Sequence, residues 1–100
     1  MMKSKIEIPK DEIAKFCHRN HIRKLSLFGS VLREDFHPGS DVDVLVEFEQ
    51  EAQIGFMALG RIRRELSQLL QRQVDLVSRE GLKPLIRESV LSNSEVVYAA

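Results

Sequence analysis

The chain has 100 residues, of which 43% are hydrophobic and 30% are charged, and these proportions indicate one domain, residues 1–100, with one core. Fifteen basic and fifteen acidic side chains give a formal net charge of zero, which makes direct nucleic-acid binding through a general positive excess unlikely. Cys17 is the only cysteine, so disulfides within the chain and multi-cysteine zinc sites are excluded. We expect a cytoplasmic protein, because we find no export signal and no apolar stretch of the roughly 20 residues that a membrane span needs.

The first part of the chain predicts a helix, a strand and a second helix. Pro9 suits the first position of a helix over residues 9–18, in which Ile13, Phe16 and Cys17 recur at helical spacing. The apolar run 25–28 predicts a buried strand that ends at Gly29. We expect a short helix over residues 30–35 and then turn residues at 37–40.

Residues 41–48 alternate with period two and predict the clearest strand of the chain. One face receives Val42, Val44, Val46 and Phe48, and the other receives Asp41, Asp43, Leu45 and Glu47. Two carboxylates on one face of a valine-rich strand are costly unless a cation or strong donors neutralise them. A solvated face is the alternative, and Glu47 supports it.

The second half predicts a helix over residues 56–70, a strand over 74–77, an amphipathic helix with Pro84 in its first turn, and a last strand over 95–98. Leu82, Leu85, Ile86 and Val90 form the apolar side of the later helix. Alternating helices and strands predict an α/β fold with a small mixed β-sheet packed with helices.

Two features point to phosphate and metal chemistry. Gly29 and Ser30 lie between a strand and a helix, where backbone N–H groups and a hydroxyl can meet an anion, although a simple helix cap is the alternative. Asp75 interrupts a short apolar strand. If that strand neighbours Asp41 and Asp43, three carboxylates converge and suit two Mg²⁺ ions; an edge-strand Asp facing water is the alternative.

The pattern L-F-G-S, ten further residues, D-V-D and a later isolated Asp on a strand resembles the nucleotidyltransferases of the DNA polymerase β-like superfamily. At average residue usage, G-S-x₁₀-D-x-D would occur by chance in about one chain in a thousand of this length. The length of the chain is similar to that of the minimal nucleotidyltransferases (MNT), many of which are antitoxins paired with a HEPN-domain toxin. The resemblance implies the palm-like fold of polymerase β.

The resemblance also implies roles for particular residues. Gly29 and Ser30 would bind the triphosphate, and Asp41, Asp43 and Asp75 would be the catalytic, metal-binding triad for two Mg²⁺ ions. Asp75 would help to deprotonate the acceptor. The reaction implied is transfer of AMP from ATP to a tyrosine hydroxyl of a HEPN-type partner.

Other basic residues are less closely tied to this pattern. Many relatives carry an Arg directly after the Gly-Ser pair, whereas here the first base is Arg33, which could reach a phosphate or lie on the surface. Arg61, Arg63 and Arg64 could contact a nucleotide or an acidic partner, or form a solvated face. His18, His21 and His37 have no zinc-site spacing, and Cys17 is expected in the core.

Three functions stay open at this point. The chain could be an active adenylyltransferase, an antitoxin that neutralises its partner only by covering it, or a catalytic subunit for a small molecule or an RNA end. Residues 41–51 hold five acids and no base, which disfavours a polynucleotide acceptor and favours a basic protein partner. Self-association is also open.

Overall fold

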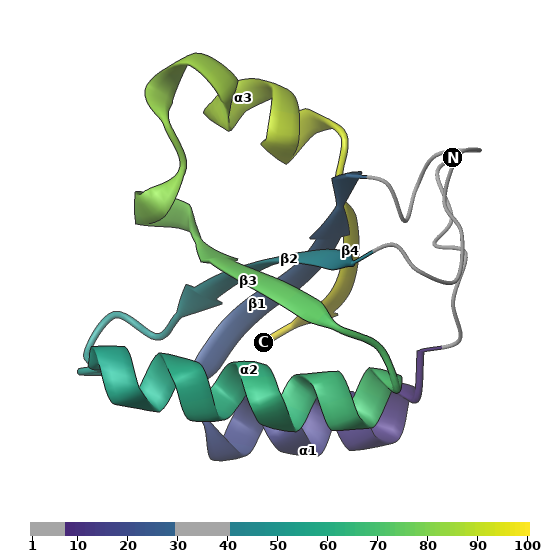
Figure 1. Ribbon diagram of the computed structural model, residues 1–100. Coiled ribbons are helices and arrows are strands. Elements are labelled where there is room, and N and C mark those ends of the chain that lie inside the picture. The colour runs from purple at the N-terminus through teal and green to yellow at the C-terminus, as the bar shows by residue number, and fades with distance from the viewer. Residues whose placement is uncertain (1–7, 30–40) are drawn as a thin grey trace.

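The computed structural model describes residues 8–29 and 41–100, which form four strands and three α-helices (Figure 1). In chain order these are α1 (Lys10–Arg19), β1 (Ile22–Phe28), β2 (Val42–Phe48), α2 (Phe56–Leu70), β3 (Val74–Ser78), the 3₁₀ helix η2 (Arg79–Gly81), α3 (Pro84–Ser92) and β4 (Glu95–Ala99). The expected helix over 30–35 and the turn over 37–40 lie outside the described residues.

The four strands form one mixed sheet in the order β3-β2-β1-β4. β1 pairs antiparallel with both β2 and β4, whereas β2 and β3 are parallel. A parallel pair needs a crossover connection, and α2 supplies it. The small mixed sheet predicted from the sequence is therefore confirmed.

The hydrophobic core lies between this sheet and the helices α1 and α2, which cover the same face (Figure 1). Ile62, Leu66 and Leu70 recur every four residues along α2 and are buried, so one apolar stripe of the helix meets the sheet. Val42 and Val44 point into the same core. The predicted inward face of β2 and the predicted bounds of α2 are both confirmed.

The boundaries of other elements differ from the prediction for local reasons. Pro9 precedes α1 as its N-cap instead of being its first helical residue. β1 begins at Ile22, three residues earlier than expected, because Ile22 pairs with Phe48 across a bulge that disturbs the alternation. The helix η2 was not predicted from the sequence; at its N-cap, the Ser78 hydroxyl accepts a hydrogen bond from Gly81 N at 3.2 Å.

We call the side of the sheet away from α1 and α2 the open face; Asp43, Leu45 and Glu47 of β2 belong to it. Asp43 is half-buried there, and Leu45 and Glu47 are buried. The predicted helix α3 lies on this side (Figure 1), but it contains no buried residue. Of the predicted apolar side, Leu82 is buried just before α3, whereas Leu85 is 97% and Ile86 48% exposed. The apolar residues in the first turns of α3 therefore do not pack into the core as the amphipathic pattern suggests.

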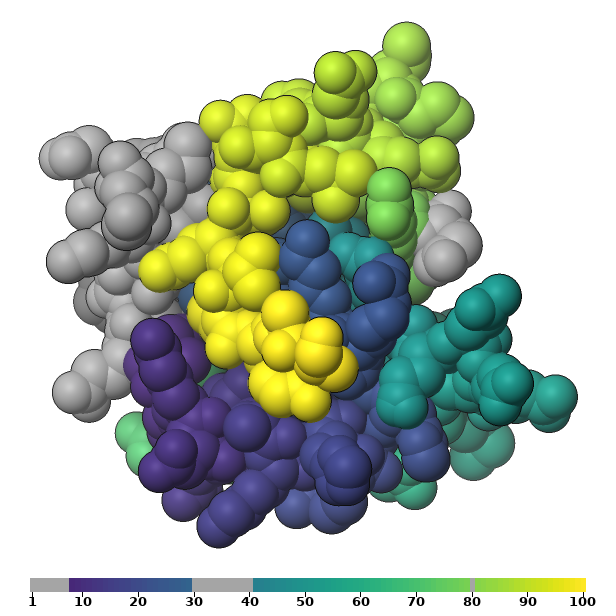
Figure 2. Space-filling view, turned by 180° about the vertical axis from the view of Figure 1, so that it is seen from behind, coloured from purple at the N-terminus to yellow at the C-terminus, as the bar shows by residue number. Residues whose placement is uncertain are grey.

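The edge strand β4 and the C-terminus are visible from behind, between α1 and α3 (Figure 2). In the described part of the chain, no helix combines the length and the apolar character required to span a bilayer.

Candidate active site

The two acids Asp43 and Asp75 face each other across neighbouring strands. In the parallel ladder between β2 and β3, Asp43 is the direct partner of Asp75, so their side chains leave the sheet on the same face. This register brings together residues that lie 32 positions apart in the sequence. β3 is also an edge strand, and Asp75 is exposed. Asp75 therefore faces water, as the alternative reading has it, and it lies beside Asp43, which is one part of the predicted set of three carboxylates.

Gly29 brings the main chain against the same carboxylate. It directly follows Phe28, whose partner in the antiparallel ladder is Asp43, and its φ is +75°. A Cβ at this position would overlap the Asp43 Oδ2 atom. Glycine alone meets both demands, the left-handed backbone and the close approach, so the geometry explains the glycine of the motif independently of any ligand.

Asp41 lies at the same end of the sheet, one residue before β2. The chain is held there by a hydrogen bond of 2.9 Å from Val42 N to Gln73 O, and Val42 pairs with Val74. Asp41 is exposed. Over residues 8–29 and 41–100, however, no three His, Cys, Asp or Glu side chains lie close enough together to hold a metal ion.

The facing pair Asp43 and Asp75 still has the chemistry that Mg²⁺ requires. Mg²⁺ prefers hard oxygen ligands, and in nucleotide enzymes it is commonly bound by one or two carboxylates together with substrate phosphates and water. Two neighbouring carboxylates at an open sheet edge, with Asp41 close in sequence, therefore fit such an ion.

The remaining predicted site residues divide into those outside and those inside the described chain. Ser30, Arg33 and His37 lie outside it. His18 and His21 are exposed, and so are Arg61 and Arg64 on α2, whereas Arg63 is half-buried.

Cys17 is in the core, as expected. Burial raises the pKa of its thiol from 9.0 to about 12 and so keeps it protonated.

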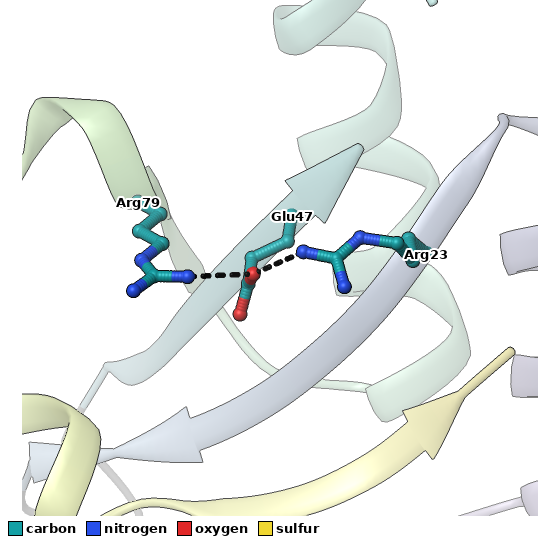
Figure 3. A network of polar contacts seen from close by, with 3 residues as sticks. All are labelled: Arg23, Glu47 and Arg79. Atoms are coloured by element: carbon teal, nitrogen blue, oxygen red, sulfur yellow. Dashed lines mark hydrogen bonds and ion pairs between the residues drawn. The ribbon is translucent and has the colours of Figure 1, made fainter. Parts of the chain in front are cut away.

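A polar network that was not predicted from the sequence lies further along the open face (Figure 3). Glu47 is buried, and its Oε1 atom accepts a hydrogen bond from Arg23 at 2.6 Å. Arg79 of η2 approaches the same oxygen at 3.4 Å. The reading of Glu47 as part of a solvated face is therefore wrong. Its position in a strand of apolar residues was the available signal, because a buried carboxylate needs partners.

This network also changes the charge expected for residues 41–51. Two guanidinium groups offset the charge of Glu47, so the negative surface after β2 comes from Glu49 and Glu51, which are exposed. These two glutamates and His21 line a pocket of about 430 Å³ at that end of the sheet.

Comparison with known proteins agrees with this geometry. The model of the nucleotidyltransferase domain family matches residues 10–97. The protein adenylyltransferase MntA of Thermococcus cleftensis is 38% identical over 77 residues, which are 77% of this chain and 74% of that protein.

Two solved structures share the fold. A structure described as a minimal nucleotidyltransferase is 34% identical, with a TM-score of 0.70 over 85% of both chains. The structure of a tri-AMPylated HEPN toxin with its MNT antitoxin, from Shewanella oneidensis, matches with a TM-score of 0.65 at 20% identity, covering 91% of this chain and 70% of that chain. The chain belongs to the nucleotidyltransferase domain family and is a nucleotidyltransferase of the minimal, polymerase β-like type.

Proposed function

We propose that the chain transfers AMP from ATP to a tyrosine hydroxyl of a HEPN-domain toxin and thereby acts as the antitoxin of that partner. The observation that carries this proposal is the pairing of Asp43 with Asp75 beside Gly29 at one end of the open face. The name of the Thermococcus relative and the AMPylated toxin in the Shewanella complex support the choice of AMP and of a HEPN acceptor. Since ATP is the donor, we place the reaction in the cytoplasm.

The predicted site residues would have separate roles in this reaction. The main chain at Gly29, with Ser30 and Arg33, would bind the triphosphate. Asp43 and Asp75, the facing pair, would hold Mg²⁺ together with the phosphates, and Asp41 would complete the set for two ions once the nucleotide is bound. The bound ions would neutralise charge on the phosphates.

The tyrosine oxygen would attack the α-phosphorus. One P–O bond forms, the bond to the bridging oxygen breaks, and pyrophosphate leaves with that electron pair. Asp75 would accept the hydroxyl proton and pass it to water.

A second candidate function is neutralisation by binding alone. Apolar side chains are strongly exposed at the start of α2 and on α3: Phe56 is 91% exposed, Met57 87% and Leu85 97%. Side chains of this kind are common in surfaces that cover a partner protein, and such a surface would work without the acids.

The intact mass of the co-purified partner separates the two functions. The partner is incubated with this chain, Mg²⁺ and each nucleoside triphosphate in turn. We expect a mass gain of whole AMP units with ATP and none with the double variant Asp43→Asn, Asp75→Asn. A matched control, Asp11→Asn at the exposed start of α1, should leave the gain unchanged.

A cell-growth assay completes the test. If the double variant still neutralises the toxin fully, catalysis is not the antitoxin mechanism, and binding alone is. If the wild-type chain adds no nucleotide to a partner with which it forms a stable complex, the proposed transfer is refuted.

A further inference from the structure

The network around Glu47 joins two strands of the sheet to the 3₁₀ helix η2 on the open face (Figure 3). Arg23 comes from the bulge in β1, Glu47 from β2 and Arg79 from η2, directly after β3. Both guanidinium groups approach the same oxygen, Glu47 Oε1, at 2.6 and 3.4 Å. The two arginines therefore converge on one point from opposite sides of β2.

The charges of this network do not cancel. One carboxylate faces two guanidinium groups, which leaves a net charge of +1. The Glu47 side chain is only 7% exposed, whereas those of Arg23 and Arg79 are 54% and 48% exposed. Each guanidinium has five N–H donors in a planar fork, and one hydrogen bond to Glu47 engages one of them. The buried carboxylate of Glu47 thus holds two half-exposed guanidinium groups in place, and each of them keeps further N–H donors. Such donors are suited to bind a carboxylate or phosphate oxygen of another molecule.

The network lies on the same face as the acids, at the other end of the strand. Asp43 and Glu47 are four residues apart on β2, a distance of roughly 13 Å along an extended strand. β1 runs antiparallel to β2, so Gly29 lies at the Asp43 end, while Arg23 lies near Glu47. Along β2 the order is therefore the Gly29 turn, the acids, and then the arginines.

If the proposed function holds, this order along β2 indicates from which end of the strand the acceptor approaches the α-phosphorus. Displacement at phosphorus is in line, so the attacking hydroxyl approaches opposite to the leaving pyrophosphate. With the pyrophosphate held at the Gly29 end, the acceptor comes from the Glu47 end of β2, where Arg23 and Arg79 are about half-exposed, whereas Leu45 itself is covered by the chain. The donor places its triphosphate at the Gly29 end, so an anion at the arginines belongs to the acceptor.

We propose that Arg23 and Arg79 form a docking site for a carboxylate of the acceptor protein. In an extended acceptor segment this carboxylate lies about four residues from the modified hydroxyl, since four residues span roughly 13 Å. Glu47 is a positioning residue that holds the two forks. The site contributes to the affinity for the acceptor and leaves the binding of ATP unchanged.

Synthetic peptides of about nine residues test the site without requiring catalysis. One peptide carries a tyrosine with a glutamate about four positions before it, a second has the glutamate about four positions after it, and matched peptides have glutamine instead. Fluorescence anisotropy measures the binding of each labelled peptide to the wild-type chain, to Arg79→Gln and to the double variant Arg23→Gln, Arg79→Gln. Arg61→Gln, on the helix layer behind the sheet, is the matched control. Thermal unfolding shows that each variant is folded.

We expect one glutamate peptide to bind the wild-type chain about tenfold more tightly than its glutamine counterpart. This preference should fall in Arg79→Gln, disappear in the double variant and persist in Arg61→Gln. Equal binding of glutamate and glutamine peptides to the wild-type chain overturns the proposal. So does weaker ATP binding in the double variant with unchanged peptide preference, because the arginines then serve the donor.

Transfer of AMP to the same peptides separates this inference from the proposed function. Glutamate-dependent binding without any transfer would leave the docking site standing and count against the transferase. Transfer that proceeds equally with glutamate and glutamine peptides, and equally in the double variant, would leave the transferase standing and refute the docking site.

Discussion

The close approach between Gly29 and Asp43 makes Gly29→Ala the sharpest test of the site geometry. An alanine at φ +75° carries a backbone cost of about 1–2 kcal/mol. Its Cβ would also overlap Asp43 Oδ2, and crowding of this kind typically costs about 1–3 kcal/mol. We expect the free energy of unfolding to fall by about 2–5 kcal/mol, or the melting temperature by at least about 8 °C.

Gly60→Ala is the matched control, because its new Cβ would lie in ordinary contact, 3.7 Å from Arg64 Nη1. Gly60 is inside α2, where alanine should raise the free energy of unfolding by about 0.5–1 kcal/mol. Urea unfolding followed by circular dichroism measures both variants, since the chain contains no tryptophan.

A double-mutant cycle isolates the contribution of the contact. In an Asp43→Ala background the overlap is gone, so Gly29→Ala should cost only the backbone part. The reasoning would be refuted if Gly29→Ala were as harmless as Gly60→Ala, or if its cost were unchanged by removal of the Asp43 carboxylate.

Two further predictions follow from the backbone and from the core. Gln71 ends α2 in the left-handed region at φ +54°, so Gln71→Gly should raise the free energy of unfolding by about 0.5–1 kcal/mol in the same urea assay, and a loss would contradict the strain argument. Cys17 has its pKa raised by burial from 9.0 to about 12, so its contribution to stability is complete below pH 9 and is lost as the pH rises from 9 towards 12. Thiol labelling at pH 8 should be slow in water and fast in denaturing urea; rapid labelling of the folded chain would show that Cys17 is not buried.

Several elements could be predicted because the signal lies within a short stretch of chain. The alternation over residues 42–48 and the helical spacing from Phe56 to Leu70 are local patterns, and each matches the periodicity with which its element presents side chains to one core. The motif around Gly29 and Asp43 is likewise readable, because its residues are close in sequence. Elements without a regular apolar period were predicted less well. The bulge at Arg23 interrupts the alternation at the start of β1, and η2 has no apolar repeat.

By itself, the sequence determined which residue types make up the candidate site, namely a glycine turn and three acids in or beside strands of an α/β chain. Only the tertiary structure decided which of these residues meet. The partnership of Asp43 with Asp75 depends on the register of a parallel ladder closed by the crossover helix α2, and the pairing of Glu47 with Arg23 and Arg79 joins three separate segments. Local periodicity sets which face a side chain occupies, whereas its partners across a sheet follow from how the whole core packs.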